Sequence, residues 1–132
     1  MRYLLDTHTL IWAITDPDKL SDKVRRILES AESHIAVSAI SFWEISLKFS
    51  IGKLVLENII PEDFLQLCRQ MDMEIIAVDA VICSTYHHLQ PLYHRDPFDR
   101  MLLWLAKSEH LTILSKDETM KQYASEGISV VW

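Results

Sequence analysis

The chain has 132 residues, of which 49% are hydrophobic and 24% are charged. This composition fits one compact domain over residues 1–132 with a core of its own, rather than two domains or a disordered tail. The formal net charge of −6 argues against a protein that coats nucleic acid through a broad basic surface, but it leaves room for a local nuclease site.

Two further sequence features concern the compartment. No uncharged apolar run approaches the roughly 20 residues of a membrane span, and Asp6 interrupts the first apolar run before a signal-peptide core can form. We therefore expect a cytoplasmic protein with no membrane contact. Cys68 and Cys83 lack the spacing of a zinc site, so both are interpreted as small core residues.

The first predicted strand is the apolar run at 3–5, which leads into Asp6 and a helical pattern over 7–14. An acid at the carboxyl end of a buried strand lies where α/β proteins bind their ligands. The alternative is that Asp6 only caps the following helix through the backbone N–H of His8 or Thr9. Capping is the better interpretation of Asp6 alone, but the arrangement recurs later in the chain and favours chemistry.

The second strand is predicted at 34–38, and a helix over 39–49 follows it. Two apolar rows predict that this helix is covered on both sides: Ile40, Trp43, Leu47 and Ile51 in one row, and Phe42, Ile45 and Phe49 in the other. Glu44 lies on the shoulder of the first row, so we expect a largely buried carboxylate that needs a partner. That partner is either Lys48, in an ion pair, or a bound metal ion, and the sequence leaves both alternatives open.

A further helix is predicted to begin at 61–63, and nothing catalytic is recognised in it. The third strand is predicted at 74–78. Asp79 follows this strand and is interpreted as the cap of a short helix. The adjacent His87 and His88, in a predicted loop at 87–91, cannot face one ion from one side of a regular element. We expect these two histidines at the surface.

The strongest helical pattern, over 101–108, follows the segment HRDPFDR at 94–100. Asp96 at the N-cap, Pro97 at the first helical position and Asp99 at the third are typical of a helix start. Asp99 also heads the inward stripe of the helix, whereas Asp96 precedes the helix. Asp99 is therefore the better candidate for a functional acid.

The fourth strand is predicted at 111–115, and Asp117 follows it in the position that Asp6 has after the first strand. A short helix over 118–125 and a last strand over 128–132 complete the predicted elements.

The alternation of strands and helices predicts an α/β fold with a central parallel sheet of about five strands, covered by helices on both faces. Asp6 and Asp117 then share one edge of the sheet, and Glu44 and Asp99 point towards it from helices. Four carboxylates cannot all ionise in a small space without cations, and oxygen ligands favour Mg²⁺ or Mn²⁺. Such an ion binds phosphate oxygens and activates water, which is the chemistry of phosphodiester hydrolysis.

The segments that carry these acids occur in a fixed order: LLDTHTLIW (4–12), SAISFWEISLKFSIGKL (38–54), HRDPFDRMLLWLA (94–106) and LTILSKD (111–117). In this order they resemble the PIN-domain ribonucleases, and particularly the VapC-like toxins of bacterial and archaeal toxin–antitoxin pairs. Each segment alone is weakly specific. Together they span nearly the whole chain, and HRDPFDR is especially close to one VapC-like subgroup.

The resemblance implies a three-layer α/β/α PIN-like domain with Mg²⁺- or Mn²⁺-dependent endoribonuclease activity. The family's catalytic and metal-binding acids fall on four residues of this chain: Asp6, Glu44, Asp99 and Asp117. Asp96 matches an additional acid of the subgroup and is interpreted as supporting. Thr7 and Ser38 match polar positions next to the acids, which implies that they hold metal-bound water.

The resemblance also implies partners. These are an RNA substrate, a cognate antitoxin protein that lies across the active-site groove, and a second copy of the chain in a homodimer. All four core acids are present, so an active enzyme is expected.

Two other interpretations remain. One is a phosphohydrolase with Asp6 as a covalent nucleophile, but enzymes resembling the haloacid dehalogenase family have an acid two residues later, where this chain has His8. The other is a non-catalytic interaction module whose acids only cap helices and whose apolar faces, such as the one bearing Trp43, bind a partner. Metal-dependent RNA cleavage by the purified protein distinguishes all three.

Overall fold

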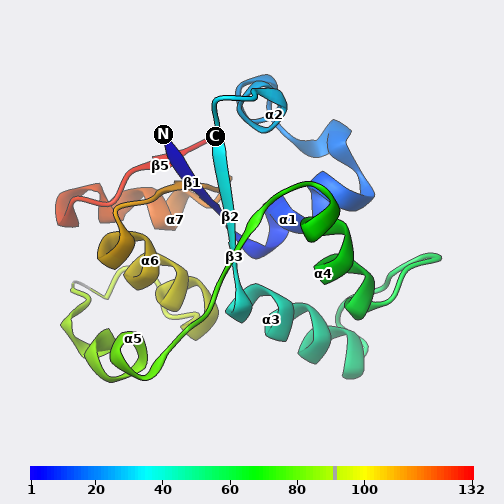
Figure 1. The fold of residues 1–132 in the computed structure, drawn as a ribbon. Helices are drawn as coiled ribbons and strands as arrows, with labels where there is room; N and C mark the ends of the chain where they lie inside the picture. The colour runs from blue at the N-terminus through cyan, green and yellow to red at the C-terminus, as the bar shows by residue number, and fades with distance from the viewer. Residues whose placement is uncertain (91) are drawn as a thin grey trace.

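The computed structural model describes residues 1–90 and 92–132, in which strands and helices alternate (Figure 1). Within these residues the strands are β1 (Arg2–Leu5), β2 (His34–Ser38), β3 (Glu74–Ile76), β4 (Thr112–Leu114) and β5 (Val130–Val131). The α-helices are α1 (Thr7–Thr15), α2 (Asp22–Glu29), α3 (Ala39–Ser50), α4 (Pro61–Gln70), α5 (Ala80–Thr85), α6 (Pro97–Glu109) and α7 (Glu118–Lys121). Three short 3-10 turns are η1 (Pro17–Lys19), η2 (Tyr86–His88) and η3 (Gln122–Glu126).

The five strands form one sheet in the order β3-β2-β1-β4-β5, and every neighbouring pair is parallel. This confirms the predicted five-stranded parallel sheet. The chain adds β2 and β3 on one side of β1 and then returns to the other side for β4 and β5. The strand order therefore reverses between β1 and β4, and this switch point is where open α/β sheets form a ligand-binding crevice.

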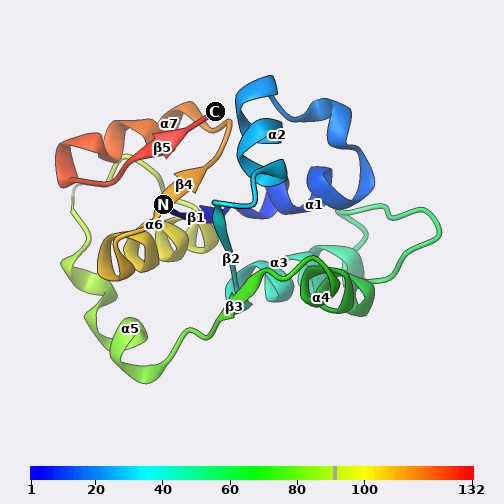
Figure 2. The ribbon, with the colours of Figure 1, turned by 45° about the horizontal axis from the view of Figure 1, so that its top comes forward.

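The sheet lies between two helical layers (Figure 2). Because successive strand residues point to opposite faces, Leu4 and Leu5 of β1 enter different cores. Leu4 packs in one cluster with Leu102 of α6, whereas Leu5 packs in the other with Leu10 of α1 and Phe64 of α4. The α5–α7 segment covers one face and the α1–α4 segment covers the other, so the predicted three-layer α/β/α arrangement is confirmed.

Three strands are shorter than predicted, because an apolar pattern marks burial rather than strand pairing. The pattern at 74–78 extended the third strand to Val78, but β3 pairs only along the last residues of β2. Ile128 is likewise buried in the core although β5 begins later. Both residues pack against the core from outside the sheet.

Two burial predictions are wrong. The helix α3 is not covered on both sides, since Trp43 is 59% exposed and Ile51 is 56% exposed. This helix packs against α1, α4 and α6, which together cover only part of its circumference. Cys83 is exposed on the short helix α5, whereas Cys68 is buried as predicted.

Local predictions in the middle of the chain hold. The carboxylate of Asp79 caps α5 by accepting a hydrogen bond from the backbone N–H of Ile82 (2.9 Å). His87 and His88 are exposed, as expected. Pro91, the last residue of that predicted loop, lies outside the described residues. Among the residues described, no helix has the length and hydropathy required to cross a membrane.

Candidate active site

Asp6 lies at the carboxyl end of β1, beside the switch point, and is only 5% exposed. One carboxylate oxygen caps α1 by accepting from the N–H of Thr9 (2.8 Å), and the other accepts from the hydroxyl of Ser115 (2.5 Å). Burial raises the pKa of Asp6, against the hydrogen bonds from Ser115 and Thr9 that lower it. Because Ser115 follows β4, this contact joins the ends of the two central strands.

Asp117 is the N-cap of α7, two residues beyond Ser115. Its Oδ1 accepts from the backbone N–H of Thr119 (2.8 Å), and its Oδ2 is 2.8 Å from Nε2 of His94. Burial alone would raise the pKa of Asp117, but the hydrogen bonds from His94 and Thr119 outweigh it and hold the pKa below its usual value. Asp117 is therefore an ionised acid at the mouth of the crevice.

The two acids at the start of α6 differ in the way that their helix positions predicted. Asp96 is the N-cap, and its Oδ1 accepts from the N–H groups of Phe98 (2.8 Å) and Asp99 (3.3 Å). Asp99, in the first turn, has its Oδ2 3.0 Å from Nε2 of His94. Burial raises the pKa of Asp99 to about 7, with a further increase from the charge of Asp96 and a smaller one from Glu44, while His94 lowers it.

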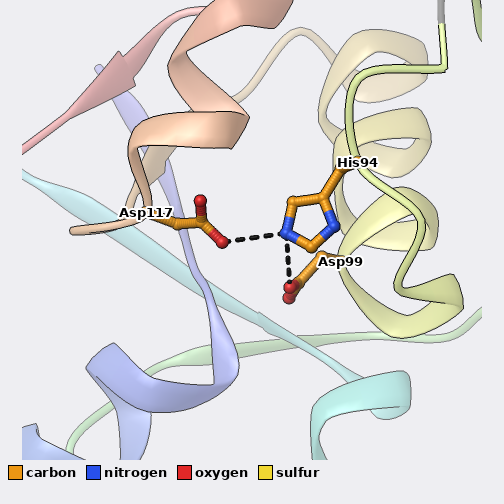
Figure 3. A group of neighbouring side chains, drawn as sticks. All are labelled: His94, Asp99 and Asp117. Carbon is orange, nitrogen blue, oxygen red and sulfur yellow. Dashed lines mark hydrogen bonds and ion pairs between the residues drawn. The ribbon is translucent and has the colours of Figure 1, made fainter.

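His94 lies between Asp99 and Asp117, and the sequence interpretation gave it no role (Figure 3). Its Nδ1 accepts from the backbone N–H of Asp96 (3.2 Å), which leaves Nε2 as the ring atom that donates to Oδ2 of Asp117 (2.8 Å) and lies 3.0 Å from Oδ2 of Asp99. Nε2 and one oxygen of each acid lie within 4.8 Å of one another, a spacing that can hold a metal ion. The available signal was its position as the first residue of HRDPFDR.

Arg100, the last residue of HRDPFDR, was also missed and is only 7% exposed. Its guanidinium donates to the hydroxyls of Tyr86 (2.7 Å) and Tyr123 (2.8 Å) and to the carbonyl of Leu89 (3.1 Å). The Tyr123 hydroxyl in turn accepts from the backbone N–H of His94 (3.1 Å). Arg100 thus fixes the segment that brings His94 to the acids.

Glu44 is buried in α3, with an exposed fraction of 3%. Its Oε2 forms an ion pair with Lys48, as one of the two alternatives predicted. Its Oε1 is buried and has no hydrogen-bond partner within residues 1–90 and 92–132. A buried carboxylate oxygen without a partner is costly, so this atom is available to a ligand.

The acids line two adjoining pockets. One, of about 330 Å³, is lined by Asp6, His8, Trp12, Asp99, Lys116 and Asp117. The other, of about 250 Å³, is lined by Thr7, His8, Ile11, Glu44, Ile45, Lys48, Lys53 and Leu54. The structure therefore brings three of the four predicted acids into one pocket and places the fourth in the next, with His8 between them.

Thr7 and Ser38 are buried and make structural contacts. The Thr7 hydroxyl donates to the hydroxyl of Ser41 (3.1 Å), and the Ser38 hydroxyl caps α3 by accepting from the N–H of Ile40 (3.1 Å). Thr7 also lines the pocket of Glu44. The predicted role of these hydroxyls in holding water stays a prediction.

The raised pKa of Asp99 predicts a stability effect in metal-free protein. Because this pKa moves from 3.8 to about 7 on folding, the folded state holds an extra proton between these values. The free energy of unfolding should therefore fall as pH rises through that window, and Asp99→Asn should remove this loss. We expect the variant to be more stable than the wild type above pH 7, with a difference that shrinks towards pH 4, in urea titrations at several pH values.

The matched control for this effect is Asp79→Asn, which changes an exposed N-cap aspartate away from the site. Asparagine caps nearly as well as aspartate, so this control should show no comparable gain above pH 7. An Asp99→Asn variant that is less stable than the wild type at high pH would contradict the prediction.

Comparison with known proteins supports the same family. The PIN domain family model matches residues 3–126. Ribonuclease VapC22 of Mycobacterium tuberculosis is 23% identical over 129 residues, which are 98% of this chain and 97% of that protein.

The fold is similar to a chain in the crystal structure of VapBC2 from Rickettsia felis bound to a DNA fragment from their promoter. The TM-score is 0.71 at 19% sequence identity, and the match covers 100% of this chain and 99% of that chain. The fold is also similar to VapBC-1 from nontypeable Haemophilus influenzae, with a TM-score of 0.66, 16% identity, and coverage of 99% and 97%. Since the family model covers nearly the whole chain, this chain belongs to the PIN domain family.

Proposed function

We propose that this chain is a divalent-metal-dependent endoribonuclease and the toxin of a toxin–antitoxin pair. The observation that carries the proposal is the convergence of Asp6, Asp99 and Asp117, from three separate elements, in one pocket at the switch point of the sheet. Membership of the PIN domain family and similarity to a protein named as a ribonuclease support the choice of RNA as substrate.

The residues at the site fit a hard divalent cation. Carboxylate oxygens are the ligands that Mg²⁺ and Mn²⁺ prefer, and the buried Oε1 of Glu44 has no partner among the described residues. Burial and the neighbouring acids raise the pKa of Asp99, and a bound cation would lower this pKa again. We therefore assign Asp6, Glu44, Asp99 and Asp117 as the residues that would hold the ion. When bound, the ion supplies the positive charge that activates water and stabilises the leaving oxygen.

The chain's own groups orient these acids. Ser115 fixes Asp6, and the N–H groups at the start of α7 fix Asp117. Nε2 of His94 lies 3.0 Å from Asp99 and 2.8 Å from Asp117, so this side chain holds the two acids towards each other. Asp96 supports the site by capping the helix that carries Asp99.

The two alternative functions explain fewer of these features. A phosphohydrolase with Asp6 as nucleophile lacks the second acid, because position 8 is an exposed histidine. A module whose acids only cap helices leaves the buried Oε1 of Glu44 without a purpose.

The proposal predicts RNA cleavage that depends on a divalent metal. Purified protein incubated with total cellular RNA should cut it with Mg²⁺ or Mn²⁺ and leave it intact with excess chelator. Asp79→Asn serves as the control, because its carboxylate caps α5 away from the site and its loss should not change the activity. Equal cleavage with and without chelator would contradict the metal-dependent mechanism.

The antitoxin and the homodimer belong to the same proposal. Expression of the chain should arrest growth of a bacterial host, and a small protein encoded beside it should relieve the arrest. Growth arrest that persists in an Asp6→Asn, Asp117→Asn double variant would show that toxicity does not come from the acids. The purified chain should elute in gel filtration at twice the mass of one copy.

A further inference from the structure

The acid-lined pocket contains three groups that the proposed chemistry does not use. His8 and Trp12 lie one turn apart on α1, and Lys116 lies between β4 and α7. A pocket that combines acids with a lysine and two aromatic rings offers contacts for each part of a nucleotide. Lysines bind phosphate, and aromatic rings bind bases by stacking.

The ring of Trp12 is held in place from two sides. It meets the ring of Trp132 edge to face (centroids 5.9 Å apart, interplanar angle 62°) and lies at 48° to the ring of His8 (5.7 Å). Neither neighbour stacks parallel to Trp12. A held aromatic ring without a parallel partner can stack a base at little entropic cost.

Two lysines each share a pocket with the exposed His8. Lys116 lines the pocket of the acids, and Lys53 lines the pocket of Glu44. Both are exposed, and neither forms an ion pair in the part of the chain that the structure describes. In a chain with a net charge of −6, two unneutralised lysines beside the acids mark a path for a phosphate backbone.

From this arrangement we propose that Trp12 is a stacking platform for the base of a nucleotide next to the bond that is cleaved. Lys116 and Lys53 are the contacts for the backbone phosphates on either side of that nucleotide. This inference rests on the proposed nuclease function and adds the residues that position the RNA in the pocket. In a duplex, neighbouring bases cover both faces of each base, so a paired base does not reach Trp12.

The test measures binding rather than cleavage. A fluorescein-labelled single-stranded RNA of 12 nucleotides is titrated with the full chain in chelator, and its anisotropy gives Kd. Trp12→Leu should raise Kd by about 5- to 150-fold, the range that corresponds to the loss of one base stack. Trp12→Phe keeps an aromatic ring and should lose much less. Lys116→Gln should weaken binding and lower the slope of log K against log salt by about 0.7.

The controls separate the loss of base stacking on Trp12 from a general loss of RNA affinity. Trp43→Leu removes an exposed tryptophan of α3, whose ring packs on Phe98 outside the pocket, and should leave Kd unchanged. A duplex of the same sequence should bind the wild type more weakly and should not respond to Trp12→Leu. If the leucine variant does not fold, tryptophan fluorescence tests whether a base stacks on Trp12. RNA should quench the fluorescence of the wild type and should quench that of Trp12→Phe much less.

Any one of four results would overturn the inference. The wild type could bind no RNA in the titration, or folded Trp12→Leu could show an unchanged Kd. Trp43→Leu could lose as much RNA affinity as Trp12→Leu, or RNA could quench the fluorescence of Trp12→Phe as much as that of the wild type. The failure of the subsite is distinguishable from failure of the proposed function. Cleavage with no dependence on Trp12 removes only the subsite, whereas Trp12-dependent binding without any metal-dependent cleavage removes only the nuclease.

Discussion

Replacing Asp99 by asparagine is expected to lower RNA cleavage by about 10²–10³-fold, the loss typical of removing one preorganised charged or polar group from an active site. The side chain lies in the acid-lined pocket beside Asp6 and Asp117, and its pKa is raised by the acids around it. Asparagine has nearly the same size but cannot supply the negative charge that a cation needs. Initial rates at saturating Mg²⁺ measure the effect, and thermal melting shows that the fold is kept.

The control within the same motif is Asp96→Asn. Asp96 accepts hydrogen bonds from the first backbone N–H groups of α6, and asparagine caps helices almost as well as aspartate. Asp96→Asn should therefore retain near-full cleavage, whereas Asp96→Ala should cost about 0.5–2 kcal/mol of stability. If Asp99→Asn stayed active and Asp96→Asn lost activity, the two roles would be reversed.

Replacing Arg100 by methionine is expected to lower the free energy of unfolding by about 3 kcal/mol, because several hydrogen bonds of a buried charged group are lost. The Tyr86 hydroxyl would lose its donor, and the Tyr123 hydroxyl would keep only the backbone N–H groups of Tyr93 and His94. Cleavage should also fall, since Tyr123 holds the backbone at His94. Urea denaturation and the cleavage rate at a temperature where the variant is folded measure the two effects.

Lys107→Met on the same helix is the matched control. Lys107 pairs with Glu126 at 3.5 Å near the surface, and such pairs contribute about 0–1 kcal/mol. Its loss should change neither stability nor cleavage by much. If Arg100→Met were no more destabilising than Lys107→Met, the buried network around Arg100 would not be what holds the His94 segment.

Local sequence signals predicted much of this fold and the placement of Asp6 and Asp117 in one pocket. Asp6 and Asp117 were recognised because each follows an apolar strand, and in a parallel sheet the carboxyl ends of neighbouring strands meet. Asp96 was recognised as a cap because capping depends on residues within one helical turn. These features depend on residues close together in the chain, which is why a single sequence contains them.

The missed features depend on contacts between distant segments. His94 acquires its role only when α6 and the end of β4 bring Asp99 and Asp117 together, 18 residues apart in sequence. The exposure of Trp43 depends on how much of α3 its neighbours cover, which helical periodicity does not contain. A buried Arg100 bonded to tyrosine hydroxyls has no local signature either.

The chemical nature of the cut RNA ends tests the central proposal most directly. If the acids hold a cation that activates water, the water attacks phosphorus and the 3′ oxygen leaves, so the products carry 5′-phosphate and 3′-hydroxyl ends. Ligation-based mapping of the ends made in Mg²⁺ or Mn²⁺, with Asp99→Asn as the inactive reference, identifies them. Products with 5′-phosphate and 3′-hydroxyl ends that form only with metal are the predicted result. Metal-independent cuts that leave a 2′,3′-cyclic phosphate would contradict it, because the 2′-hydroxyl of the RNA would then be the nucleophile.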